Sequence, residues 1–284
     1  MTSEIIDIHP HIISPDTARY PIAPQHGHRS NWSQTRPVSF GQMITEMDEA
    51  GVAKAAIVHS STTYGHDNSY VADCVAQDPE RFTGVYSFDL LAPDAAKTFD
   101  YWLAHGMGGI RLFTGGATHQ TEGSWLVNPA TFPIWERCAE IGMTMAVQTT
   151  PDGLSMVAEL ARRFPAVRIA LDHCARPSLD GGPPYAACAG LFELARYDNV
   201  YMKITPRTFD LAQAAPGGAE AFFPHLVRVF GADHLAFGSN YPASAGPLST
   251  LIAQGDACFG ALSDEERAWV WGRTAQILYP ALAD

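Results

Sequence analysis

The chain has 284 residues, 46% hydrophobic and 17% charged, which is enough for one large α/β core or for two domains. Its 18 lysines and arginines against 30 aspartates and glutamates give a formal net charge of -12, which argues against nucleic acid as a partner because phosphate-backbone binding needs clustered basic residues. Five cysteines without a C-x-x-C pair indicate neither a zinc knuckle nor a disulfide framework, so a reducing compartment fits best.

Eight short runs rich in apolar and β-branched residues recur along the chain and predict strands. They cover residues 5–9, 54–60, 83–88, 109–113, 143–148, 167–172, 199–204 and 234–239. Between the first six strands, five segments carry apolar residues at helical spacing and end near glycine or proline, namely 39–51, 68–79, 93–106, 129–142 and 153–165. Ser263 and Glu266 fit a capping box at the start of a final helix.

The repeated order of strand and helix, with strands that are continuously apolar, predicts an α/β protein with a parallel sheet. Eight such units favour a distorted (β/α)8 TIM barrel over an open doubly wound sheet, and we expect one domain over residues 1–284. A barrel of this kind carries its chemistry at the carboxyl ends of its strands. Polar residues stand at many of these ends, namely His9, His11, His59, Ser60, Ser61, Thr62, Asp89, Arg111, Gln148, Asp172, His173, Lys203, Arg207 and Asn240.

The first strand ends in two histidines, His9 and His11, on either side of Pro10. Residues two apart on a strand share a face, so both histidines should point into the mouth of the barrel. A single histidine is more often a hydrogen-bonded residue under a loop than a ligand, but polar residues at many strand ends favour a convergent site. The long segment that follows, residues 14–39, should cover this mouth. Its Tyr20, His26, His28, Arg29 and Trp32 are more readily explained as bystanders than as ligands.

Five short segments at strand ends carry a resemblance to a known family. The segments "DIHPHI", "GIRLF", "LDHCARP", "VYMKITPRT" and "AFGSNYP", in this order, resemble the amidohydrolase superfamily of amidohydrolase-2 type. Within it they are similar to the lactone hydrolases that include 2-pyrone-4,6-dicarboxylate lactonase, sulfomuconolactone hydrolase and the sugar lactonases. Each segment alone is a weak signal, and the five together span nearly the whole chain.

The resemblance implies roles for individual residues. His9, His11 and His173 would surround and polarise the carbonyl of a lactone. Arg111 and Arg207 would bind anionic groups of the substrate, since a guanidinium can hold a carboxylate or sulfonate through two parallel hydrogen bonds. For both arginines a salt bridge at the rim of the barrel is the simpler alternative. Thr62 stands where relatives have a serine that touches the substrate.

Gln148 departs from the pattern of the metal-bearing members, which place a histidine at the end of strand five. A tight binuclear site is therefore not expected, and we expect no required cofactor. His9, His11 and His173 could still hold a single divalent metal such as Zn²⁺, although without a carboxylate such a site would be poorly neutralised.

Asn240 is the sharper departure, because relatives have aspartate there as the general base that activates water. An amide can orient a water molecule but cannot take its proton at neutral pH, so the chain as it stands should be slow or inactive. Either this is a natural member with another base, or an aspartate has been replaced in the laboratory. We favour the replacement, because the rest of the site keeps the pattern.

The sequence therefore predicts a hydrolase that opens a small carboxylated or sulfonated lactone, as in the catabolism of aromatic compounds, by attack of an activated water. No G-x-S-x-G elbow suggests a covalent serine route, and no glycine-rich motif suggests a nucleotide cofactor. Two alternatives stay open: a metal-dependent non-oxidative decarboxylase of the same superfamily, and a barrel that binds small anions without catalysis.

The sequence contains no run of about 18 uncharged apolar residues and no basic segment ahead of an apolar one. We expect a cytoplasmic protein without a membrane partner, and the sequence is compatible with a homo-oligomer.

Overall fold

The computed structural model describes residues 4–115 and 123–283 of the chain. Eight parallel strands pair with their neighbours in chain order from β1 to β8. Their bounds are β1 (Ile5–Asp7), β2 (Val52–Val58), β3 (Phe82–Tyr86), β4 (Met107–Phe113), β5 (Thr144–Gln148), β6 (Arg168–Leu171), β7 (Val200–Ile204) and β8 (Leu235–Phe237). Each lies within three residues of a predicted strand, so the strand prediction is confirmed.

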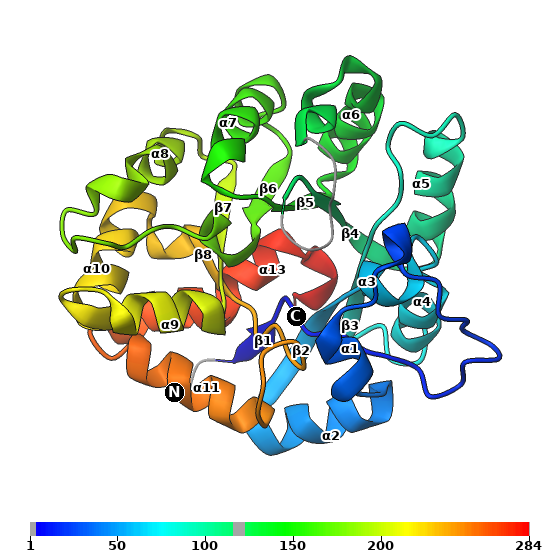
Figure 1. The fold of residues 1–284 in the computed structure, drawn as a ribbon, viewed down its shortest axis with the longest axis horizontal. Helices are drawn as coiled ribbons and strands as arrows, with labels where there is room; N and C mark the ends of the chain where they lie inside the picture. The colour runs from blue at the N-terminus through cyan, green and yellow to red at the C-terminus, as the bar shows by residue number, and fades with distance from the viewer. Residues whose placement is uncertain (1–3, 116–122, 284) are drawn as a thin grey trace.

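The first and last strands are short and nearly close the ring. β1 and β8 have three residues each, and the backbone N–H of Ile8 donates to the carbonyl of Phe237 at 3.2 Å across the gap. Helices surround the strands on the outside (Figure 1). The described residues thus form a single-domain (β/α)8 barrel, as the alternation of strand and helix predicts.

The helices of the first five units match the five predicted segments. The α-helices are α1 (Asn31–Thr35), α2 (Phe40–Ala50), α3 (Ser61–Tyr64), α4 (Ser69–Val75), α5 (Ala95–Ala104), α6 (Phe132–Ile141), α7 (Leu154–Arg163), α8 (Ala189–Phe192), α9 (Pro206–Ala214), α10 (Gly218–Phe230), α11 (Leu248–Cys258), α12 (Asp264–Ala268) and α13 (Thr274–Leu278). The capping box is confirmed, since Ser263 Oγ accepts from the backbone N–H of Glu266 at the start of α12. The predicted segments did not include α9, α10 and α11. Proline and glycine obscure this stretch, because Pro224 lies inside α10.

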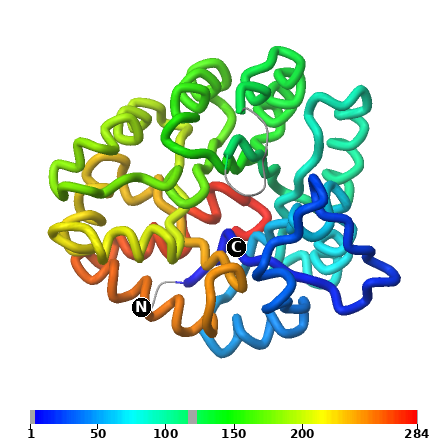
Figure 2. The backbone as a smooth tube through the Cα atoms, in the orientation of Figure 1, coloured from blue at the N-terminus to red at the C-terminus, as the bar shows by residue number. Residues whose placement is uncertain are grey.

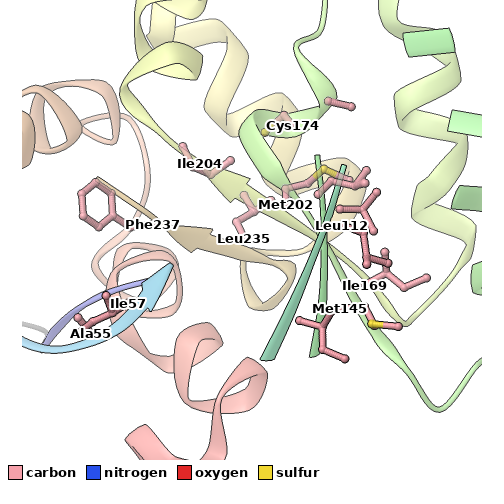
Figure 3. Packing of buried hydrophobic residues seen from close by; sticks show 14 of the residues in the cluster. Ala55, Ile57, Leu112, Met145, Ile169, Cys174, Met202, Ile204, Leu235 and Phe237 are labelled. Atoms are coloured by element: carbon pink, nitrogen blue, oxygen red, sulfur yellow. The ribbon is translucent and has the colours of Figure 1, made fainter. Parts of the chain in front are cut away.

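The strands separate two apolar clusters. Side chains such as Ile57, Met145 and Ile169 belong to the large cluster that also contains buried residues of the surrounding helices (Figure 3). Their neighbours along the strands, among them Ala56, Ala146, Ala170 and Ala236, belong to a smaller cluster with residues of α13. Alternation along a strand explains this division. Four strands, β2, β5, β6 and β8, contribute only alanine at these positions or pair alanine with valine, which leaves room inside the barrel for long polar side chains.

The C-terminal segment covers the amino-terminal end of the barrel. α13 lies across the middle of the ring of strands (Figure 2). Tyr279 is fully buried there, and a Cβ atom at Gly109 would come within 2.7 Å of its ring, so this packing requires glycine in β4. Lys54 Nζ also donates to the carbonyl of Leu282 at 3.0 Å. The opposite end, where the strands finish, is left for a site. Among the described residues, no helix has the length and apolar character needed to cross a membrane.

Candidate active site

A cavity of about 150 Å³ lies at the carboxyl ends of the strands. It contains six of the seven residues predicted for the site. Its lining consists of His11, Ser30, Trp32, Ser60, Ser61, Thr62, Arg111, Phe113, Gln148, His173, Arg176, Arg207, Asn240 and Ala243. The seventh predicted residue, His9, is fully buried beside the lining histidines.

The three predicted histidines converge. The ring centroid of His9 lies 5.1 Å from those of both His11 and His173. β1 ends at Asp7, so the first two histidines follow the strand rather than belong to it, although the carbonyl of Pro10 still accepts from the N–H of Val58. Gly238 allows His9 to sit this deep, because a Cβ atom there would lie 2.6 Å from the Cβ of His9. The prediction that His9 and His11 converge is confirmed.

His11 has a defined protonation pattern. Its Nδ1 lies 2.8 Å from the carbonyl oxygen of Val58, and a carbonyl can only accept, so Nδ1 carries the hydrogen. Burial first, and then the nearby Arg111 guanidinium, lower the pKa of His11 to about 3. The ring is therefore neutral near pH 7, and its Nε2 atom offers a lone pair rather than a hydrogen. Trp32 stacks on this ring at 5.2 Å.

His173 opens a strained turn after β6. Residues 173–176 all have φ between 50° and 55°, which is a left-handed turn built without glycine. Each such residue costs roughly 1 to 2 kcal/mol, so the surrounding packing must hold the turn in place. His173 Nδ1 lies 2.8 Å from Thr205 Oγ1, and burial, opposed by Asp172 and aided by Arg111, lowers its pKa to about 3. The turn brings both His173 and Arg176 to the cavity.

A buried ionic cluster lies beneath the cavity. The carboxylate of Asp172 accepts from Arg111 Nε at 2.7 Å, and Lys203 Nζ lies 3.1 Å from its other oxygen. Asp172 and Lys203 are completely buried. Burial alone would raise the pKa of Asp172, but Lys203 and Arg111 hold it well below its usual range, so the carboxylate stays ionised. His9 Nδ1 lies 3.5 Å from the same carboxylate.

Arg111 is held from two sides. Besides its bond to Asp172, its Nη2 donates to Gln148 Oε1 at 2.9 Å, and Gln148 Nε2 donates to the carbonyl of Gly115 at 3.0 Å. The side-chain amide of Gln148 is thus fixed by Gly115 and orients the guanidinium of Arg111. Nη1 makes no hydrogen bond to any described residue. Arg111 is therefore both part of a salt bridge and part of the cavity wall, and substrate binding by Arg111 stays a prediction.

Two further arginines carry charge that the described protein does not neutralise. Arg176 and Arg207 both line the cavity, and neither forms an ion pair with a carboxylate in residues 4–115 or 123–283. Arg176 Nε is buried without a hydrogen-bond partner in the same part of the chain. Burial and then the neighbouring Arg207 and Arg111 lower the pKa of Arg176, as expected where cations crowd together. The cavity is locally positive in a protein with a net charge of -12.

Asn240 lies at the edge of this cavity, after β8. It is 5% exposed and has a φ of 52°. Its Nδ2 donates to Ser244 Oγ at 3.0 Å, which fixes the amide plane. An aspartate with the same geometry could accept from that hydroxyl and still present its other oxygen. On the opposite side, Thr62 Oγ1 donates to Ser30 Oγ at 2.9 Å, which ties α3 to the segment after β1.

Sequence reasoning missed several residues of the site. Trp32 belongs to the cavity lining, although its place in a long loop suggested a bystander. Arg176 was not selected because it follows the strand end by several residues, although the "LDHCARP" segment contains it. Asp172 and Lys203 stood at predicted strand ends, but their pairing could not be seen. His59 has the simpler role, since its ring Nε2 is bonded to the carbonyl of Gly65 at 2.8 Å.

The donor set offers a metal ion little net negative charge. Neither ring nitrogen of His9 has a hydrogen-bond partner among the described residues, which alone would suit a ligand. However, one carboxylate, Asp172, already faces two cations, Arg111 and Lys203, and a divalent metal would add to that positive charge. Within the described ranges no group of three or more histidine, cysteine, aspartate or glutamate side chains is arranged to hold a metal ion.

Comparison with known proteins identifies relatives of this chain. The profile of the amidohydrolase family matches residues 6–281. L-fucono-1,5-lactonase of Burkholderia ambifaria is 28% identical over 171 residues, which cover 55% of this chain and 56% of that protein. The match thus spans little more than half the length of that relative. 4-sulfomuconolactone hydrolase of Rhizobium radiobacter is 25% identical over 243 residues, covering 84% of this chain and 75% of the relative.

Solved structures share the fold at low sequence identity. A candidate 2-pyrone-4,6-dicarboxylic acid hydrolase from Pseudomonas putida aligns with a TM-score of 0.78 at 20% identity over the whole of both chains. An amidohydrolase from Burkholderia multivorans with bound zinc aligns with a TM-score of 0.77 at 20% identity, covering 98% of this chain and 99% of that one. A 2,6-dihydroxybenzoate decarboxylase aligns with a TM-score of 0.66 at 14% identity, covering 98% and 99%.

Proposed function

Because this chain belongs to the amidohydrolase family, we propose that it is a hydrolase that opens a small anionic lactone by attack of water. The observation that carries this proposal is the positive cavity itself. Arg176 and Arg207 line it without an acidic partner in the described residues, beside two neutral histidines, one placed to act on a carbonyl group and the other on a water molecule. The names of the two curated relatives, both enzymes of lactones, support the same substrate class. A carboxylated or sulfonated lactone from the breakdown of aromatic compounds would fit.

The anionic groups of the lactone bind to Arg176 and Arg207. Such binding replaces the missing counter-charges, and a guanidinium can hold a carboxylate or sulfonate through two parallel hydrogen bonds. The compact cavity, about 150 Å³, then holds the lactone ring against the histidines. Overall repulsion between the acidic protein and an anion is reversed locally, which also favours entry of the substrate.

Different groups act on the carbonyl and on the water. The lactone oxygen that becomes negative needs donors, and Arg111 Nη1 and His173 can supply them from the cavity wall. His11 cannot donate from Nε2 while its Nδ1 hydrogen is bonded to Val58, so it accepts a hydrogen bond from the attacking water instead. The role of His11 as a donor to the carbonyl, which the family resemblance implied, is therefore not part of this proposal.

Asn240 limits the reaction. It can hold the water through its carbonyl oxygen, but it cannot take the proton. His11 is a weak base because its pKa lies near 3. Turnover by the protein with Asn240 should accordingly be slow, whether the asparagine is natural or replaces an aspartate. With aspartate at this position, the carboxylate would take a proton from water as the oxygen adds to the carbonyl, and the ring would open to a carboxylate and an alcohol or enol.

The decarboxylase alternative has support from the fold alone, through the similarity to 2,6-dihydroxybenzoate decarboxylase. The decarboxylase chemistry depends on a metal ion, and the two cations that already face Asp172 favour the lactonase proposal over it. A barrel that binds anions without catalysis has only Asn240 in its favour.

The decisive experiment compares the protein with Asn240 with its Asn240→Asp variant on a panel of carboxylated lactones. We expect Asn240→Asp to raise the rate of hydrolysis by roughly 10²- to 10⁴-fold, the usual contribution of a positioned acid or base. Uptake of base at constant pH measures ring opening, and released carbon dioxide measures decarboxylation. Ser244→Ala serves as a control, because it removes the hydroxyl that orients residue 240 and should reduce the gain. If Asn240→Asp hydrolyses no lactone, the protein is better described as a binding barrel.

A further inference from the structure

A second cavity adjoins the candidate active site. Its volume is about 380 Å³, and it lies between the turn η1 (Gln25–Gly27) and the segments that follow β2, β3 and β4. Most of its walls are apolar. The apolar part consists of Phe88, Leu90, Leu91, Leu112, Phe113 and Trp125, and the lining is completed by Gln25, His26, His66, Ser87, Asp89 and Arg111. The proposed reaction gives this space no role.

The two cavities share one wall. Arg111 and Phe113, two residues apart in β4, line both of them. The guanidinium carbon of Arg111 lies 4.8 Å from the centre of the Phe113 ring, so the two side chains form one stacked partition. Asp172 and Gln148 hold Arg111 in place, and the partition is therefore a fixed part of the site.

Size and polarity divide the two spaces. The active-site cavity, at about 150 Å³, is smaller than the roughly 300 to 1,000 Å³ common for small-molecule pockets. It has room for a ring with its anionic groups. The adjoining cavity is larger and lined mainly by carbon, and the exposed carboxylate of Asp89 stands in its wall, which disfavours an anion there. Cations crowd the first cavity and apolar side chains line the second.

We propose that the second cavity binds an uncharged aromatic or alkyl arm of the lactone whose ring and anionic groups occupy the first cavity. This inference rests on the proposed function and narrows its substrate class to lactones with an apolar substituent. The substrate extends from one cavity into the other past the side chains of Arg111 and Phe113, which line both. Its anionic end faces Arg176 and Arg207, and its arm lies among Phe88, Leu91 and Trp125. The charge of Asp89 keeps a substrate from binding the other way round.

Calorimetric binding of two simple carboxylates tests this arrangement without any turnover. The probes are butanoate and 4-phenylbutanoate, which differ by one phenyl group. We expect the protein with Asn240 to bind 4-phenylbutanoate at least about tenfold more tightly, because burial of an aromatic ring contributes on this scale. Leu91→Asp places a charge in the wall of the second cavity, and the fold should tolerate this change because Leu91 is 40% exposed. The variant should bind the two probes equally, with its affinity for butanoate unchanged. Ile141→Asp on α6, at a residue that is 46% exposed, makes the same kind of change away from both cavities and should keep the preference.

Equal affinities for the two probes in the protein with Asn240, including no detectable binding of either, would overturn the proposal. A preference that survives Leu91→Asp would do the same. The hydrolysis assay with Asn240→Asp runs in parallel on a carboxylated lactone with and without a benzyl substituent. If both lactones are hydrolysed with equal kcat/KM, the proposed role of the second cavity is wrong and the lactonase function stands. If the protein prefers 4-phenylbutanoate but hydrolyses neither lactone, the proposed lactonase function is wrong.

Discussion

Replacement of Lys203 by methionine tests the buried ionic cluster beneath the site. Lys203 and Asp172 are both completely buried, and their charged atoms lie 3.1 Å apart. Methionine has a similar length and no charge, so the change removes the cation with little change in packing. The loss of one partner of a buried pair typically costs about 3 to 5 kcal/mol, because the remaining charge stays desolvated. Arg111 still pairs with Asp172 at 2.7 Å, so we expect the lower part of this range, about 3 kcal/mol.

Urea denaturation at pH 7 measures this cost, and a double-mutant cycle with Asp172→Asn isolates the pair. The double variant should be more stable than the sum of the single changes predicts, since it leaves no unpaired carboxylate. Arg137→Met is the matched control, because the Arg137–Asp100 pair is largely exposed, at 38% and 55%, and should be worth less than about 1 kcal/mol. A loss at Lys203 no larger than at Arg137, or strict additivity in the cycle, would refute the view that Lys203 stabilises an ionised Asp172.

Three further expectations concern binding, pH and metal. Arg176→Met should weaken binding of a carboxylated lactone by roughly 2 to 4 kcal/mol in calorimetry, whereas the exposed Arg162→Met should not. The depressed pKa of His173, about 3 in the folded protein, means that the unfolded chain takes up a proton first as the pH falls below about 6.5. The stabilisation that the protein gains from a neutral His173 should therefore be complete above pH 6.5 and be lost towards pH 3. His173→Asn should make Tm fall less steeply across this window. An unchanged slope would contradict a neutral His173 ring in the folded protein. The Asn240→Asp protein should keep its activity after treatment with a chelator, and a loss that Zn²⁺ restores would show that a metal takes part.

The sequence by itself determined the architecture. Eight apolar runs separated by helical segments bury both faces in a parallel sheet covered by helices, and the number of units favoured a closed barrel over an open sheet. It also determined which residues gather at the carboxyl ends of the strands, since six of the seven predicted residues line one cavity there. That prediction needs only the rule that parallel strands finish at the same end. The turns after β6 and the helices α9, α10 and α11 were not predicted, because glycine and proline interrupt the helical pattern in this part of the chain.

Only the tertiary structure decided which polar groups pair with each other. Arg111 and Asp172 are 61 residues apart, and their bond depends on the register between β4, β5 and β6. The same holds for Lys203, whose buried charge is tolerable solely because the carboxylate of Asp172 faces it across β6 and β7. The pairing leaves Arg176 and Arg207 as the unneutralised cations. The sequence alone could not distinguish these two from Arg111 and Lys203. Charged groups pair only when they lie a few ångströms apart in space. Sequence patterns indicate the spacing of residues along the chain and the face of a strand or helix on which they lie, but not these distances.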